Sequence, residues 1–168
     1  NLTLYLQEIE EREGISILEQ VNDLTAGSTV PVAEGDFGNP FNDPGWRTHI
    51  TSRFGKRPDV GLPSKDTTNH NGLDIAYGYG TPILAVQSGT VITATTSPSY
   101  GNYVVIDHGG GICTLYAHCS RLLVRVGQTV SKYDTIAEVG STGDSTGNHL
   151  HICFIVNGQY TDPEQYLH

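Results

Sequence analysis

Residues 149–156 read His-Leu-His-Ile-Cys-Phe-Ile-Val, a short run rich in apolar and β-branched side chains. Such a run predicts a β-strand. Because side chains two apart on a strand point to the same side, His149 and His151 can face one point in space. Cys153 continues the same parity, but strand twist carries a third position away from that point. The run therefore predicts a strand that presents two imidazoles on one face.

Seven further runs of this kind precede it, at the spacing expected of an all-β sandwich or barrel. They cover residues 49–53, 72–76, 82–86, 89–95, 102–107, 111–118 and 135–139. The chain has 20 Gly and 8 Pro among 168 residues, which indicates many turns, and it is long enough to bury a core. The sequence predicts an all-β domain in this region.

The first 45 residues follow a different pattern. Apolar residues recur at helical spacing on either side of Gly14 and predict one interrupted helix or two short ones; they are Leu2, Leu6, Ile9, Ile17, Val21 and Leu24. The next segment, to Gly45, is rich in Gly, Pro, Asn and Asp and reads as a surface linker. We therefore predict a helical arm at residues 1–24, a linker at 25–45 and the β-domain at 46–168. Through residues 1–45 the domain could join a tether domain or a larger assembly.

The net charge of −9 belongs almost entirely to the arm and linker. Residues 1–43 hold nine acidic residues and one basic residue, Arg12, whereas residues 44–168 hold nine acidic and eight basic residues. A nearly neutral β-domain lacks the basic stripe that tracks phosphates, so we expect no nucleic-acid partner. We also expect no electrostatic attraction to an anionic wall polymer or lipid surface. No apolar run reaches 18 residues, so no membrane span is predicted.

A second polar stretch, His70-Asn71-Gly72-Leu73-Asp74, places an imidazole and a carboxylate four residues apart. This spacing serves one face of a helix or of a strand, and Gly72 and the β-rich surroundings favour the strand. Two imidazoles and one carboxylate around an open position suit a catalytic zinc ion, whereas structural zinc sites are usually closed by four protein ligands. The second imidazole would come from either His149 or His151, which the spacing does not distinguish.

The remaining histidine of that pair and His118, in the run 111–118, would then be free bases beside the metal. The chain has no HExxH motif, in which a Glu beside the metal takes the proton. We therefore expect histidine to accept the proton of the attacking water, steady the oxyanion or protonate the leaving amine. Tyr103 and Tyr116 could donate a hydrogen bond to the intermediate or simply pack in the sheet.

Seven ordered stretches between Trp46 and Leu167 resemble the lysostaphin/LytM-type (M23) zinc endopeptidases of peptidoglycan. They are ITSRFGKR at 50–57, HNGLDI at 70–75, GTPI at 80–83, GNYVVIDHG at 101–109, TLYAH at 114–118, GQTV at 127–130 and VGSTG at 139–143. The resemblance implies a compact antiparallel, sandwich-like β-sheet domain with a zinc groove on one face, bordered by loops at 58–69, 96–101 and 140–148.

The same resemblance implies roles for five residues. His70, Asp74 and His151 would bind Zn²⁺, and His118 and His149 would be the catalytic histidines. The scissile bond would be an amide in the peptide part of peptidoglycan, either in a glycyl bridge or in a cross-link such as D-Ala to diaminopimelate. We expect the protein to act outside the cell at the bacterial wall, as a secreted, surface-anchored or phage-tail enzyme.

Three residues depart from the family pattern: Asn148 stands where Pro is common, Ile152 where an aromatic is common and Cys153 where a charged residue is common. None of them removes a ligand or a catalytic histidine. In latent members of the family an upstream Asn occupies the fourth zinc position, and Asn39 and Asn42 are the candidates here. The three cysteines are too few for a disulfide framework, so we expect buried free thiols.

Two other functions compete with an endopeptidase. A silent binding or regulatory module on the same fold predicts gaps in the set of five residues, and there are none. A related zinc carboxypeptidase that trims stem peptides would normally show a longer His-to-Asp spacing and a carboxylate base. The chain begins at Asn1 and shows no signal peptide, from which we expect a fragment or a processed form.

Overall fold

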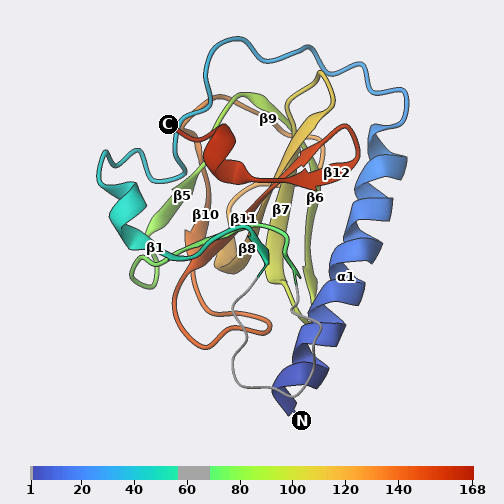
Figure 1. Ribbon diagram of the computed structural model, residues 1–168. Coiled ribbons are helices and arrows are strands. Elements are labelled where there is room, and N and C mark those ends of the chain that lie inside the picture. The colour runs from blue at the N-terminus through green and yellow to red at the C-terminus, as the bar shows by residue number, and fades with distance from the viewer. Residues whose placement is uncertain (1, 57–68) are drawn as a thin grey trace.

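The computed structural model describes residues 2–56 and 69–168, and Figure 1 shows their arrangement. In chain order the elements are α1 (Leu2–Thr25), the 3-10 helix η1 (Trp46–His49), β1 (Ile50–Ser52), β2 (Gly55–Lys56), β3 (Asn69–His70), β4 (Leu73–Ile75), β5 (Pro82–Leu84), β6 (Gly89–Ser97), β7 (Gly101–Asp107), β8 (Ile112–Leu122), β9 (Thr129–Val130), β10 (Thr135–Val139), β11 (Leu150–Val156), β12 (Gln159–Thr161) and the 3-10 helix η2 (Pro163–Gln165). Each of the eight predicted runs overlaps one strand, and β6, β7 and β8 extend beyond the predicted bounds, while the short strands β2, β3, β9 and β12 were not predicted.

Ten strands form one sheet, and β2 and β3 form a separate two-stranded ladder. The main path of the large sheet runs β1-β4-β11-β8-β7-β6-β9, with β10 paired to β5 and β8 and with β12 paired to β11. Every strand pair in the described ranges is antiparallel. The predicted antiparallel all-β fold is confirmed.

Strand β8 changes partner at His118. Up to Ala117 it pairs with β11, and from Cys119 onward it pairs with β10. Its register with β7 also shifts here, because Asn102 pairs with Cys119 whereas Val104 pairs with Tyr116. His118 has φ 63°, which is uncommon for a residue other than glycine. Such an irregularity in a ladder turns a side chain away from the regular alternation, so β8 aims His118 differently from its neighbours.

The two faces of the sheet bury two separate apolar clusters. The larger one contains Trp46, Tyr116 and Phe154, and residues 37–41 of the linker pack against it through Phe37 and Phe41. The smaller one lies between α1 and the sheet and consists of Ile17, Val21, Tyr100, Tyr103, Val105, Cys113, Leu115, Ala117, Cys153 and Ile155. Figure 1 shows α1 lying along one side of the sheet. Because His151 shares the strand parity of Cys153, the predicted metal site lies on the face that α1 covers.

Helix α1 is continuous, so the predicted interruption at Gly14 is wrong. Gly14 is buried against the sheet, where an added Cβ would come within 2.8 Å of Asn71 Nδ2 and 2.9 Å of Tyr100 Oη. Tyr160 Oη donates a hydrogen bond of 2.6 Å to the carbonyl oxygen of Gly14. Close packing therefore accounts for this glycine, and the helical backbone tolerates it because tertiary contacts hold the helix in place.

The acidic side chains of α1 are not all directed into solvent. Glu13 Oε1 accepts hydrogen bonds from the backbone N–H groups of Ser99 at 2.9 Å and Tyr100 at 3.4 Å. These bonds tie the helix to the turn between β6 and β7. Among the described residues, no helix combines the length and hydropathy that a membrane crossing requires.

Thr25 is the last residue of α1. The rest of the predicted linker, residues 26–45, contains no helix or strand but is bonded to the sheet domain. The backbone N–H of Gly38 donates to Val86 O at 2.9 Å, and that of Leu84 donates to Pro40 O at 2.7 Å. Together with the packing of Ile17 and Val21, these bonds hold residues 2–45 against the β-domain. Arm and linker therefore pack on the body of the molecule.

Candidate metal centre

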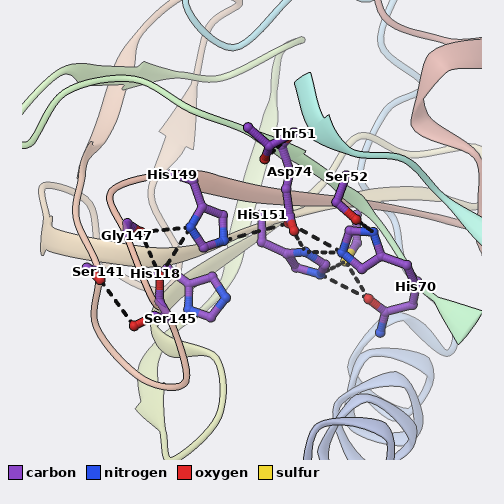
Figure 2. Close-up of polar contacts among 12 residues, drawn as sticks. Thr51, Ser52, His70, Asp74, His118, Ser141, Ser145, Gly147, His149 and His151 are labelled. Carbon is purple, nitrogen blue, oxygen red and sulfur yellow. Dashed lines mark hydrogen bonds and ion pairs between the residues drawn. The ribbon is translucent and has the colours of Figure 1, made fainter. Parts of the chain in front are cut away.

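Three ligand atoms from three strands meet at the centre of the predicted site (Figure 2). His70 Nε2 lies 3.3 Å from Asp74 Oδ1 and 3.2 Å from His151 Nδ1, and His151 Nδ1 lies 2.8 Å from Asp74 Oδ1. The sheet register explains the meeting, because Asp74 on β4 stands directly opposite His151 on β11. Gly72 lets the chain approach β11 closely, since an added Cβ would overlap the carbonyl oxygen of Ile152.

The spacing of these atoms fits a zinc ion. Tetrahedral coordination at a bond length of about 2.0–2.1 Å sets neighbouring donor atoms about 3.3 Å apart. Two lone-pair nitrogens and a carboxylate oxygen would repel one another at the observed distances unless a cation or a proton lay between them. The donor set therefore suits Zn²⁺, with His70, Asp74 and His151 contributing one atom each.

In both His70 and His151, the ring nitrogen that faces away from the cluster has a hydrogen-bond partner, which leaves the nitrogen that faces the cluster free for a metal. His70 Nδ1 donates to Arg53 O at 3.0 Å and lies 3.2 Å from Ser52 Oγ, so its proton is on Nδ1 and its Nε2 carries a lone pair. His151 Nε2 lies 2.9 Å from Asn71 Oδ1, an acceptor for its proton, which leaves Nδ1 to face the cluster. Such outer hydrogen bonds commonly orient metal-binding histidines.

The electrostatics of the site favour the protonation states that a metal needs. Burial opposes ionisation of Asp74, but the close contacts of its carboxylate with the rings of His151 and His70 outweigh burial and hold the pKa of the carboxyl well below its ordinary value. Burial lowers the pKa of His151, although Asp74 opposes the shift. An ionised carboxylate beside a neutral imidazole is the form that binds a cation.

His118 lies beside this cluster with one ring nitrogen bound and the other available. Its backbone N–H donates to Tyr100 O at 2.9 Å, and its Nδ1 donates to Thr142 O at 2.8 Å. Burial, with the nearby His151, lowers the pKa of His118 to about 3, so the ring is neutral near pH 7. A neutral ring that donates through Nδ1 presents Nε2 as a proton acceptor.

His149 is the second histidine beside the cluster, and its ring centroid lies 4.8 Å from that of His118. Its Nδ1 donates to Gly147 O at 2.9 Å and lies 3.1 Å from Ser145 Oγ, while its Nε2 lies 3.7 Å from Asp74 Oδ1 (Figure 2). His149 precedes β11 and forms an isolated bridge with Gly140. All five predicted site residues are thus brought together by the fold.

The loops beside the site are partly fixed. Thr142 Oγ1 donates to Cys119 O at 2.6 Å, and the backbone N–H of Asp144 donates to Ser99 O at 2.7 Å. The segments predicted as loops at 96–101 and 140–148 therefore contact each other next to His118. Most of the third predicted loop, at 58–69, falls outside the described residues.

The two tyrosines singled out from the sequence lie in the apolar clusters of the sheet. Tyr116 belongs to the apolar cluster on the opposite face of the sheet, and its hydroxyl accepts hydrogen bonds from Val86 N and Thr114 Oγ1. Tyr103 is 3% exposed and packs under α1. The tyrosine that lies against the site is Tyr100, whose ring centroid is 5.6 Å from that of His151. Its position in a turn gave no periodic signal in the sequence.

Asn39 and Asn42 do not contact the ligand atoms in the described part of the chain. The side chain of Asn39 accepts from the backbone N–H groups of Phe41 and Asp43 and donates to His168 O, while Asn42 is exposed. The asparagine at the site is Asn71, which sequence reasoning missed although it lies between His70 and Asp74. Cys153 Sγ lies 3.2 Å from His151 Nε2, on the side of the ring away from Asp74. All three cysteines are buried and free, as predicted.

Comparison with known proteins identifies the family. The sequence profile of peptidase family M23 matches residues 68–163, more than half of the chain. The chain belongs to peptidase family M23. It is 42% identical over 117 residues to peptidoglycan DD-endopeptidase ShyA of Vibrio cholerae serotype O1, a match that covers 70% of this chain and 26% of that protein. The chain thus spans about a quarter of the length of this relative.

Solved structures of two peptidases share the fold. A zinc-containing peptidase from Vibrio cholerae superposes with a TM-score of 0.70 at 37% identity, over 77% of this chain and 39% of that one. The catalytic domain of the antimicrobial peptidase lysostaphin from Staphylococcus simulans superposes with a TM-score of 0.62 at 31% identity, over 69% of this chain and 89% of that domain. The zinc-containing relative and the His-Asp-His cluster agree with Zn²⁺ as the cofactor of this M23 chain.

Proposed function

We propose that this chain is a zinc-dependent endopeptidase that cleaves peptide cross-links or bridges of bacterial peptidoglycan. The observation that carries the proposal is the cluster of three ligand atoms with two further histidines beside it, whose Nε2 atoms are not used by the bonds that orient them. The substrate class is supported by the relative named a peptidoglycan DD-endopeptidase. His70, Asp74 and His151 would hold the metal, and His118 and His149 would be the catalytic histidines.

A bound zinc ion would supply an electrophile for the scissile carbonyl and an acidified water. Side chains of the protein would carry out the proton transfers. The carbonyl oxygens of Thr142 and Gly147 hold the Nδ1 protons of His118 and His149, so each ring can accept a proton at Nε2. After protonation, either ring can donate from Nε2 to the oxyanion or to the leaving amine. No carboxylate base is needed for this scheme.

The domain organisation of the chain and the place where it acts are also part of the proposal. We infer a helical arm at 1–24, a linker at 25–45 and the catalytic domain at 46–168. We also infer that the protein acts at the bacterial wall, as a secreted, surface-anchored or phage-tail enzyme. Residues 2–45 pack on the domain, so a tether or larger assembly would attach to a chain whose first helix is already seated beside the site.

Digestion of peptidoglycans with different cross-bridges tests the function. The zinc-loaded chain should create new amino termini within the bridges or cross-links, which mass spectrometry identifies, and the His149→Ala variant is the matched control. Wild-type protein with zinc bound that creates no new termini in any substrate would contradict the proposal. Release of a carboxy-terminal residue alone would favour the carboxypeptidase instead.

A further inference from the structure

The side chain of Asn71 connects the proposed metal site to the turn between β6 and β7. Its Oδ1 lies 2.9 Å from His151 Nε2, and its Nδ2 donates a hydrogen bond of 2.6 Å to Tyr100 Oη. Neither contact involves a reacting atom of the scheme above. Any effect of the amide on the metal site is therefore transmitted through the ring of His151.

A neutral imidazole carries one proton, and two acceptors compete for the proton of His151. Asp74 Oδ1 lies 2.8 Å from Nδ1, and Asn71 Oδ1 lies 2.9 Å from Nε2. A ring with its proton on Nδ1 would bond to the Asp74 carboxylate, and its lone pair would be on Nε2, facing away from the other ligand atoms. An amide oxygen is an acceptor only, so Asn71 favours the proton on Nε2. Without Asn71, the nearest partner of Nε2 is the thiol of Cys153 at 3.2 Å, which is a weak acceptor.

The orientation of Asn71 is itself fixed by α1 and by Tyr100. The Tyr100 hydroxyl accepts from Nδ2, which directs Oδ1 toward His151. Gly14 of α1 closes over both groups, since any Cβ there would come within 2.8 Å of Asn71 Nδ2 and 2.9 Å of Tyr100 Oη. Tyr160 Oη holds Gly14 from the neighbouring strand β12 through a bond of 2.6 Å to its carbonyl oxygen. The amide is thereby held between the helix and the sheet.

We propose that Asn71 is a positioning residue that keeps the proton of His151 on Nε2, so that Nδ1 is available to zinc, and that α1 holds Asn71 in place. This inference rests on the proposed function for its metal. It makes the arm a structural part of the metal site rather than a connection alone. It also explains why the helix carries a glycine at the point where it passes the site.

The test compares Asn71→Leu, which has a similar volume and no polar atoms, with Asn71→Asp, which keeps an acceptor for Nε2. Zinc affinity is measured by competition with a chelator, and the tautomer of His151 is read in the metal-free protein from ¹⁵N shifts of its ring. Asn71→Leu should weaken zinc binding by about 10–100-fold and move the proton to Nδ1, whereas Asn71→Asp should keep both properties near those of the wild type.

Asn39→Leu is the matched control, because it removes a buried amide with three hydrogen bonds away from the ligand atoms. It should lower the melting temperature and leave zinc affinity unchanged. Equal zinc affinity in wild type and Asn71→Leu, with an unchanged tautomer, would overturn the inference. A wild-type chain that binds no zinc would contradict the proposed function, while the metal-free tautomer measurement would still decide the role of Asn71.

Discussion

The four histidines of the site differ in which ring nitrogen their surroundings leave free. Backbone carbonyls bind Nδ1 of His70, His118 and His149, so each of these rings presents Nε2. His151 is held in the opposite sense, with Asn71 at Nε2 and the ligand cluster at Nδ1. The difference follows from the strand register, which sets His151 directly opposite Asp74.

Substitution of single histidines should separate metal binding from proton transfer. We expect His70→Ala to lose zinc, because it removes one of three ligand atoms. His118→Ala and His149→Ala should keep zinc while kcat falls about 10²-fold or more, the usual contribution of a general acid or base. Zinc content by atomic absorption and kcat on a cross-linked peptide provide the two readings. Equal zinc loss in all three variants would contradict the proposed roles.

Much of this site could be predicted from residue spacing, but the choice within the histidine pair could not. His149 and His151 have the same strand parity, and only the start of β11 at Leu150 separates them. The resemblance to M23 enzymes favoured His151 as the ligand, and this assignment stays a prediction. Asn71 was missed because its partners, Tyr100 and His151, are distant in sequence and meet only in the folded chain.

At the scale of elements, α1 shows that tertiary packing can keep a helix continuous where helix propensity predicts a break. An interior glycine predicts a weak or broken helix, since glycine costs about 1 kcal/mol relative to alanine. The helix nevertheless runs from Leu2 to Thr25, because Ile17 and Val21 are buried and Glu13 is bonded to the β6–β7 turn. The longer strands of the large sheet were easier to predict, because alternating or continuous apolar residues are a local sequence signal. Two-residue strands such as β9 contain too few residues to show a period.

Gly14→Ala should therefore destabilise the protein, against the expectation from helix propensity. The gain of about 1 kcal/mol in the helix is opposed by overpacking against Asn71 and Tyr100, which typically costs about 1–3 kcal/mol. We expect a lower melting temperature and weaker zinc binding, measured by calorimetry and chelator competition. Ser16→Ala, at an exposed position of the same helix, is the control and should change the free energy of unfolding by less than about 0.5 kcal/mol. A melting temperature for Gly14→Ala at or above that of the wild type would show that the contact is not tight.

At the scale of the whole molecule, a buried histidine remote from the metal ligands links stability to pH. His108 is 1% exposed, and its Nδ1 donates to Ser88 O at 2.8 Å while its Nε2 lies 2.7 Å from Thr114 Oγ1. Burial lowers its pKa from 6.5 to about 4. Between these two values the unfolded chain binds more protons than the folded one, so stability falls as the pH drops through this window.

This linkage predicts a particular difference between wild type and His108→Asn. The contribution of His108 is fully present above pH 6.5 and is lost progressively down to pH 4, by about 3 kcal/mol at most for a shift of this size. Asparagine keeps a donor toward Ser88 and does not titrate. Urea unfolding at pH 7 and pH 4.5 should therefore show a smaller loss of stability in the variant. Equal losses in both proteins would mean that other groups cause the acid sensitivity.

The left-handed backbone of His118 has a consequence for any attempt to stabilise this domain. A residue with a side chain generally pays on the order of 1 kcal/mol or more to hold φ near 63°, whereas glycine adopts that conformation freely. Backbone energetics alone would thus select His118→Gly as a stabilising change. The same change deletes a proposed proton acceptor. At position 118, thermal stability favours glycine, whereas the proposed catalysis requires an imidazole. The chain therefore keeps histidine there although its backbone conformation is unfavourable.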